Sequence, residues 1–100
     1  GNAGNRRHRF ITGLWLDRGG RLWLGTGGGL AWFDPTTQSL HDGPAAGPVM
    51  AMLDTKDGRV LVATNEGLCR FDGTSLSPPL RTGPIRRLAR DEGGGVWAVG

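Results

Sequence analysis

Arginine is the most frequent charged side chain in this sequence. Twelve basic residues outnumber nine acidic ones, giving a net charge of +3, and every basic residue except Lys56 is an arginine. Three of them, Arg81, Arg86 and Arg87, fall within ten residues. Because a guanidinium group can hold a carboxylate or phosphate through two hydrogen bonds, these arginines could bind an anionic ligand or an acidic partner. The alternative is that they are solvated or paired with carboxylates.

Residues for catalysis, metal binding or cofactor binding are sparse. His8 and His41 are far apart in the sequence, with neither in metal-ligand spacing nor beside a plausible nucleophile. The glycine-rich run 25–29 is no dinucleotide fingerprint, because Leu30 stands where that motif needs a glycine and an aromatic segment follows. The aspartates in the turns are too few for a calcium loop. We therefore predict no catalytic residues, no metal site and no cofactor.

The composition also disfavours nucleic-acid and membrane partners. A charge of +3 produces a weak field, and no aromatic residues interleave with the arginines. There is no apolar run near the roughly 20 residues that a membrane helix needs, and the basic start of the chain lacks the apolar core of a signal peptide. The single cysteine, Cys69, excludes an intrachain disulfide framework, so redox chemistry does not specify the compartment. We expect neither nucleic-acid binding nor direct membrane contact.

An internal repeat organises the chain. Residues 21–26 (RLWLGT) are matched 38 positions later by residues 59–64 (RVLVAT), and residues 29–34 (GLAWFD) by residues 67–72 (GLCRFD). A third, partial copy occupies residues 95–100 (GVWAVG). The constant spacing indicates that one structural unit is used more than once.

Each unit consists of short apolar segments separated by turns. Segments rich in β-branched and aromatic residues begin the units at Ile11, Val49 and Ile85, and no segment shows helical periodicity. Glycine, proline, aspartate and threonine fill the turns between segments. The fourth and weakest strand is expected near residues 38–41 in the first unit and at residues 75–77 in the second.

A repeat of about 40 residues that forms four short strands is typical of a β-propeller blade. We therefore predict an all-β fold with two complete four-stranded blades, parts of others, and an incomplete ring in this one chain. The expected divisions are a basic N-terminal segment or the end of a preceding blade at 1–10, blade 1 at 11–48, blade 2 at 49–84 and a partial blade 3 at 85–100.

One blade cannot cover both faces of its own sheet. The large apolar side chains at the repeat positions should therefore pack against neighbouring blades, and each one that is fully buried contributes about 1.5–3 kcal/mol. These positions are Trp23, Leu61, Trp97, Phe33 and Phe71. The predicted partners are consequently other blades, from the same longer chain or from identical copies.

The motif residues resemble the two-component regulator propeller repeat. In the first unit the shared pattern runs from Asp17 and Gly20 through residues 22–26 (LWLGT) to residues 29–30 (GL) and 33–35 (FDP). The second unit departs from it at three positions, Leu61, Ala63 and Gly73. Such repeats occur in tandem in extracytoplasmic sensor regions of bacterial hybrid histidine kinases. The resemblance therefore implies a periplasmic or extracytoplasmic location and signal recognition upstream of a kinase or another output domain.

These observations favour a non-catalytic ligand- or partner-binding module over an enzyme. Two alternatives stay open, namely part of a propeller lyase resembling the streptogramin lyases and a self-assembling propeller fragment that acts as a scaffold. Loop variation on a rigid scaffold is the usual route to specificity. We therefore expect an anionic or glycan ligand at the connections 41–48 and 80–84, bound by Arg81, Arg86, Arg87 and His41.

Overall fold

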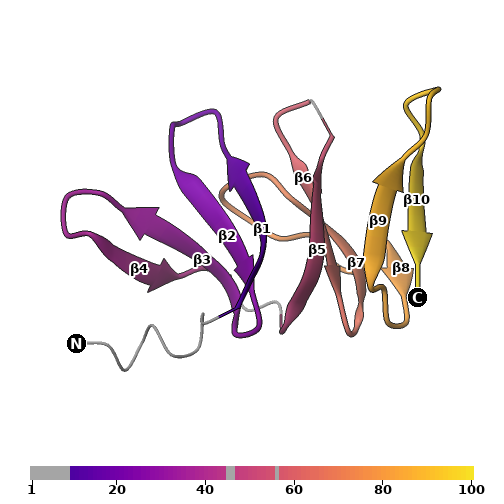
Figure 1. Cartoon of the computed structure of the whole chain (residues 1–100), viewed down its shortest axis with the longest axis horizontal. Helices are drawn as coiled ribbons and strands as arrows, with labels where there is room; N and C mark the ends of the chain where they lie inside the picture. Colours follow the sequence, from indigo (N-terminus) through magenta and orange to yellow (C-terminus); the bar gives the residue numbers. More distant parts are fainter. Residues whose placement is uncertain (1–9, 45–46, 56) are drawn as a thin grey trace.

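The structure, a computed structural model, describes residues 10–44, 47–55 and 57–100, which form antiparallel strands and turns (Figure 1). Within these ranges there is no helix of a length and apolarity suited to crossing a membrane. The prediction of an all-β fold is confirmed. The basic segment predicted at 1–10 lies, apart from Phe10, outside the described residues.

Ten strands in the described ranges form three sheets. The first sheet has the order β1-β2-β3-β4, the second β5-β6-β7-β8, and the third contains β9 and β10. Their bounds are β1 Ile11–Leu16, β2 Leu22–Thr26, β3 Gly29–Asp34, β4 Ser39–Asp42, β5 Val49–Asp54, β6 Val60–Thr64, β7 Gly67–Phe71, β8 Arg81–Thr82, β9 Arg87–Arg90 and β10 Val96–Val99. None of the sheets is closed, as expected for separate propeller blades.

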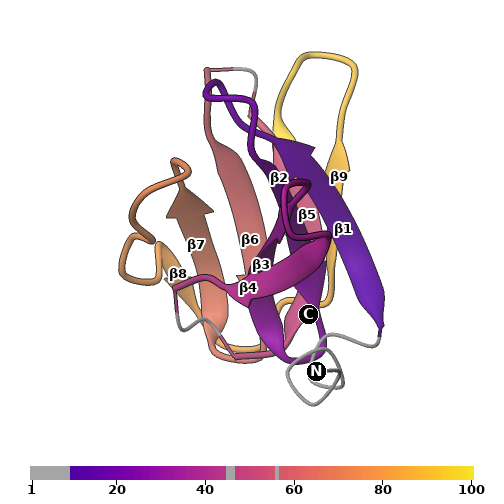
Figure 2. The ribbon, with the colours of Figure 1, turned by 90° about the vertical axis from the view of Figure 1, so that its left-hand side faces the viewer.

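The sheets stand in a row with their first strands adjacent. Strand β5 contacts β1 on one side and β9 on the other. Figure 1 shows the turns of the hairpins β1-β2, β5-β6 and β9-β10 along the upper side of the row, and the β2-β3 and β6-β7 turns along its lower side. Viewed from the side, β3 and β4 of the first sheet diverge from β7 and β8 of the second (Figure 2). This arrangement is that of propeller blades fanning out from their first strands.

The sequence repeat is also a repeat in three dimensions. Trp23 pairs with Trp15 across β2 and β1, and Leu61 pairs with Leu53 across β6 and β5. Trp97 pairs with Ala89 across β10 and β9, so all three repeat positions occupy the same place in the register.

Glycines set the turn at the end of each first hairpin. Gly20, Gly58 and Gly94 adopt φ angles of 87°, 86° and 85°, in the left-handed region that glycine enters without steric cost. Each turn closes through a backbone hydrogen bond at an equivalent position, and the Asp17 N to Arg21 O distance in the first is 3.0 Å. The same turn therefore occurs three times, once in each repeat unit.

The core lies between the first and second sheets. Phe71 of β7 makes edge contacts with Trp15 and Trp23 of the first sheet, with ring centroids 5.9 and 4.6 Å apart. Leucine and valine side chains complete the buried cluster, namely Leu30, Val49, Val60 and Val62. Because these rings come from different sheets, their burial stabilises the stacking of one unit on the next.

The fourth strand of the second sheet differs from the sequence-based expectation. It is β8 at Arg81–Thr82, whereas the expected segment 75–77 makes only an isolated bridge, between Leu76 and Phe71. Pro78 and Pro79 lie between the two pairings, and proline has no N–H for the ladder. The prolines therefore interrupt the pairing, which resumes only at β8.

Candidate functional site

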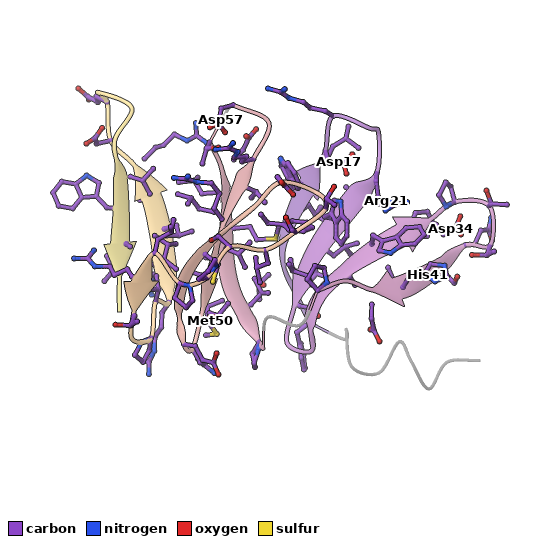
Figure 3. All side chains as sticks on the ribbon, turned by 180° about the vertical axis from the view of Figure 1, so that it is seen from behind. Asp17, Arg21, Asp34, His41, Met50 and Asp57 are labelled. Atoms are coloured by element: carbon purple, nitrogen blue, oxygen red, sulfur yellow. The ribbon has the colours of Figure 1, made fainter. Side chains whose placement is uncertain are left out.

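The arginines predicted to bind a ligand lie on two sheets. Arg81 is on the edge strand β8, while Arg86 precedes β9 and Arg87 begins it. All three are exposed, and none forms a salt bridge with a carboxylate of the described residues. His41 lies on β4, at the opposite end of the row from β9 and β10 (Figure 3). The structure thus separates His41 from the arginines, and the anion site stays a prediction.

His41 belongs instead to a group of side chains on the outer strands of the first sheet. Its ring stacks on Trp32 with centroids 4.4 Å apart and an interplanar angle of 21°. Its Nε2 lies 3.4 Å from Asp34 Oδ2. The guanidinium carbon of Arg21 lies 4.1 Å from the Trp32 ring centroid, a cation–π distance. Figure 3 shows Arg21, Asp34 and His41 together in this part of the molecule.

The carboxylate of Asp34 is held ionised in this group. Desolvation raises its pKa, but hydrogen bonds from the backbone of Thr36 and Thr37 outweigh that effect and hold the pKa below its ordinary value. The charge of His41 acts in the same direction. The charge of Asp34 is therefore stabilised by neighbouring groups of the same sheet.

Asp17 connects the turn of the first hairpin to the core. Its Oδ1 accepts a hydrogen bond from the Arg21 N–H and its Oδ2 accepts one from the indole N–H of Trp23, both at 2.9 Å. Partial burial raises the pKa of Asp17, but the bonds from Trp23, Arg21 and Gly19 outweigh it and lower the pKa overall. The aspartate thus orients the Trp23 ring that packs on the second sheet.

A polar cleft of about 330 Å³ lies beside Asp17, between the first two hairpins. Arg18 crosses it, because its Nη2 donates a 2.9 Å hydrogen bond to the backbone carbonyl of Asp57. The guanidinium also lies so close to Gly58 that a Cβ there would be 2.2 Å from Arg18 Nε. The polar groups at this cleft therefore join neighbouring units.

A larger cleft, of about 740 Å³, lies between the connection that follows β4 and the outer part of the second sheet. Its walls come from Pro44 on one side and from Cys69, Leu76, Pro78 and Pro79 on the other. It opens where the two prolines interrupt the pairing of β7, opposite Cys69. This cleft is not predicted from the sequence, although a Pro-Pro pair near an expected fourth strand indicates irregular pairing.

The only cysteine, Cys69, lines this cleft and is buried. Burial raises the pKa of its thiol, and the charge of Glu66 raises it further. A thiol with a raised pKa remains protonated at neutral pH and is a poor nucleophile. In the repeat Cys69 corresponds to Ala31, which is also fully buried, so both positions take a small apolar side chain.

The repeat positions predicted to pack between blades differ in burial. Trp23, Leu61 and Phe71 are buried, with exposed fractions of 3%, 7% and 0%. Phe33 is half-buried, and Trp97 is 63% exposed. Phe33 lies in the first sheet of the row and Trp97 in the last, and each of these sheets has a described neighbour on one side only.

Comparisons with known proteins bear on the fold. No protein-family model matches the sequence, and no curated protein sequence is significantly similar to it. A solved structure does match, the extracellular domain of a protein assigned as a hybrid two-component system, BT3049, from B. thetaiotaomicron. The TM-score is 0.63 at 19% sequence identity, over 88% of this chain.

The similarity is one of fold. The match covers 13% of the solved chain, so this sequence corresponds to a small part of a much longer domain.

Among the described residues, no group of three or more histidine, cysteine, aspartate or glutamate side chains is placed to hold a metal ion.

Proposed function

We propose that this chain is a non-catalytic ligand- or partner-binding module of β-propeller blades, within a bacterial signal-sensing protein that acts upstream of a kinase or another output domain. One observation carries the proposal, namely the shared fold with the extracellular domain of a hybrid two-component system. The resemblance of the repeat motif to the regulator propeller repeat supports it independently. An extracytoplasmic location is part of the same proposal.

The ligand proposed for this module is an anion or a charged glycan. Arg81, Arg86 and Arg87 support it, since their side chains are exposed and form no salt bridge with a described carboxylate. A free guanidinium group can bind a sulfate, phosphate or carboxylate in a bidentate manner. The packing residues between the sheets would then serve as the rigid support for the loops.

Calorimetry with a sulfated disaccharide, compared with its unsulfated form, tests this proposal. We expect binding of the sulfated form only, weakened about tenfold in the Arg86→Ala/Arg87→Ala double variant, with an almost unchanged melting temperature. The Arg59→Ala/Arg70→Ala variant removes the same charge from residues outside β8 and β9 and should bind almost normally. Equal weakening in both variants, or no binding by the parent chain, would contradict the proposal.

A second candidate function is assembly with further blades, in the same chain or in identical copies. Large apolar side chains are exposed on the first and last sheets, with Leu14 at 62%, Leu16 at 64% and Trp97 at 63%. Trp97 occupies the register position at which Trp23 packs on Phe71. Another sheet with a Phe71-like side chain would fit there.

Light scattering coupled to size exclusion tests the second candidate. Rising protein concentration should shift the chain to larger species, and Trp97→Lys should reduce that shift because it places a charge on the apolar face. A monomer that persists at all concentrations would count against this candidate.

A further inference from the structure

The 740 Å³ cleft between the first two sheets has the size of a small-molecule site, for which about 300–1,000 Å³ is usual. The cleft results from the interrupted pairing of β7 near Pro78 and Pro79. Strand β7 pairs with Leu76 through one bridge and then with Arg81, so the segment containing Pro78 and Pro79 bulges away opposite Cys69. At the equivalent place in the first sheet, β4 pairs regularly with β3.

Two of the four hydroxyl groups on the cleft wall, those of Thr64 and Ser77, are already engaged. Thr64 Oγ1 donates to the Gly67 carbonyl at 3.0 Å and accepts from the Glu66 N–H at 3.1 Å. Ser77 Oγ accepts from the Arg70 N–H at 2.8 Å and donates to the Pro78 carbonyl at 2.9 Å. A ligand therefore meets the apolar side chains of leucine, cysteine and proline, together with the hydroxyl groups of Thr74 and Ser75.

Glu66 is the only charged side chain among the described residues that line the cleft. Its carboxylate forms no salt bridge with any cation of the described chain. It lines the same cleft as the Cys69 thiol. An apolar cleft with one uncompensated carboxylate is complementary to an apolar molecule that carries a positive charge.

We propose that this cleft binds a small organic ammonium ion, whose apolar part lies on Cys69, Leu76 and the prolines and whose charged group pairs with Glu66. The inference rests on the proposed binding function and names a second site and ligand class for it. The site is separate from Arg86 and Arg87, which do not line the cleft.

The thiol of Cys69 provides a local readout, because it lines the cleft and no other cysteine is present. Its rate of reaction with a neutral disulfide reagent, 4,4′-dithiodipyridine, would be measured in the presence of hexylammonium, hexanol or hexanoate at neutral pH. We expect hexylammonium to slow the reaction in a saturable manner, hexanol to act more weakly, and hexanoate to have little effect. Backbone amide shifts of Leu76 on titration with the same three compounds give a second measurement that needs no thiol reaction.

Glu66→Gln keeps the shape of the side chain and removes its charge. Because Glu66 is exposed, this variant should bind hexylammonium about two- to fivefold more weakly, and it should no longer distinguish hexylammonium from hexanol. Glu92→Gln is the matched control, since Glu92 is an exposed glutamate outside the cleft and its loss changes the net charge equally. Equal protection by hexylammonium and hexanoate, or equal loss in both variants, would overturn the inference.

The two proposals can fail separately. If none of the hexyl compounds protects Cys69 or shifts the Leu76 amide while the sulfated disaccharide still binds, the cleft inference is wrong and the binding function stands. If neither class of probe binds, both are wrong.

Discussion

Trp23 belongs to the first sheet but has much of its packing surface on the second. Its ring meets Phe71 edge-on, and its indole N–H donates to Asp17. Trp97 holds the same register position on the third sheet, where it is exposed. Substitutions at Trp23 and Trp97 therefore show how much of a loss in stability comes from burial, because the residue type is the same at both positions.

Replacing Trp23 with alanine should lower the free energy of unfolding by about 3–5 kcal/mol, because it leaves a cavity between two sheets. Trp97→Ala should change it by no more than about 0.5 kcal/mol, as is usual at an exposed position. Urea denaturation followed by circular dichroism measures both. Similar losses in the two variants would show that Trp23 is not the packing residue described here.

The carboxylate of Asp17 gives the fold a dependence on acid. Its pKa is lower in the folded chain than its ordinary value of 3.8, so the ionised form favours folding. This contribution is fully present above the ordinary value and is lost as the pH falls through the lowered pKa. Acid should therefore destabilise the fold partly by protonating Asp17.

Trp23→Phe removes one hydrogen-bond donor to Asp17 while keeping an aromatic ring. The pKa of Asp17, followed by NMR of its side-chain carbon, should rise in this variant because the bond from the indole N–H is lost. The acid-dependent part of the stability should shrink accordingly. An Asp17 that titrates identically in both proteins would mean that the indole bond has no influence on it.

At the scale of elements, the start of β7 depends on a glycine. Gly67, at the start of β7, has a φ of 153°, and a Cβ on it would lie 2.1 Å from the carbonyl oxygen of Arg81. Gly67→Ala should cost about 1–3 kcal/mol, because alanine is strained at this φ and its Cβ would clash with backbone atoms of β8. Gly27→Ala is the control, since no atom lies within 4 Å of its Cβ position. Thermal unfolding would compare the two, and equal melting temperatures would contradict this account of the turn.

Most strands could be predicted from the sequence, because their signals are local. From Ile11 onward, two apolar runs are separated by turn residues, as the hairpin β1-β2 requires. The sequence repeat predicts the same hairpin for β5 and β6. The fourth strand of the second sheet could not be placed in this way. Its pairing depends on where β7 regains a partner after Pro78 and Pro79, which is a tertiary property.

The candidate site was less predictable than the fold. Arg81, Arg86 and Arg87 are close in sequence and were grouped for that reason, but β8 and β9 belong to different sheets. His41 is expected at the end of the fourth strand and the start of the connection 41–48, and it lies within β4, where it pairs with Trp32. The cleft beside Glu66 requires knowledge of how two sheets diverge, which neither periodicity nor composition contains.

At the scale of the molecule, the account depends on the second sheet stacking on the first. Both the buried core and the proposed cleft exist only if the sheets stand side by side as Figure 1 shows them. Trp23 and Phe71 are distant in sequence and belong to sheets that share no strand. Contact between them is therefore a property of stacking alone.

A nuclear Overhauser effect between the indole protons of Trp23 and the ring protons of Phe71 tests this stacking most directly. A strong effect is expected, with upfield ring-current shifts for the protons of the ring that presents its edge to the other, because the ring centroids are 4.6 Å apart in an edge-to-face arrangement. Observation of sequential and within-sheet effects without any between these two rings would contradict it.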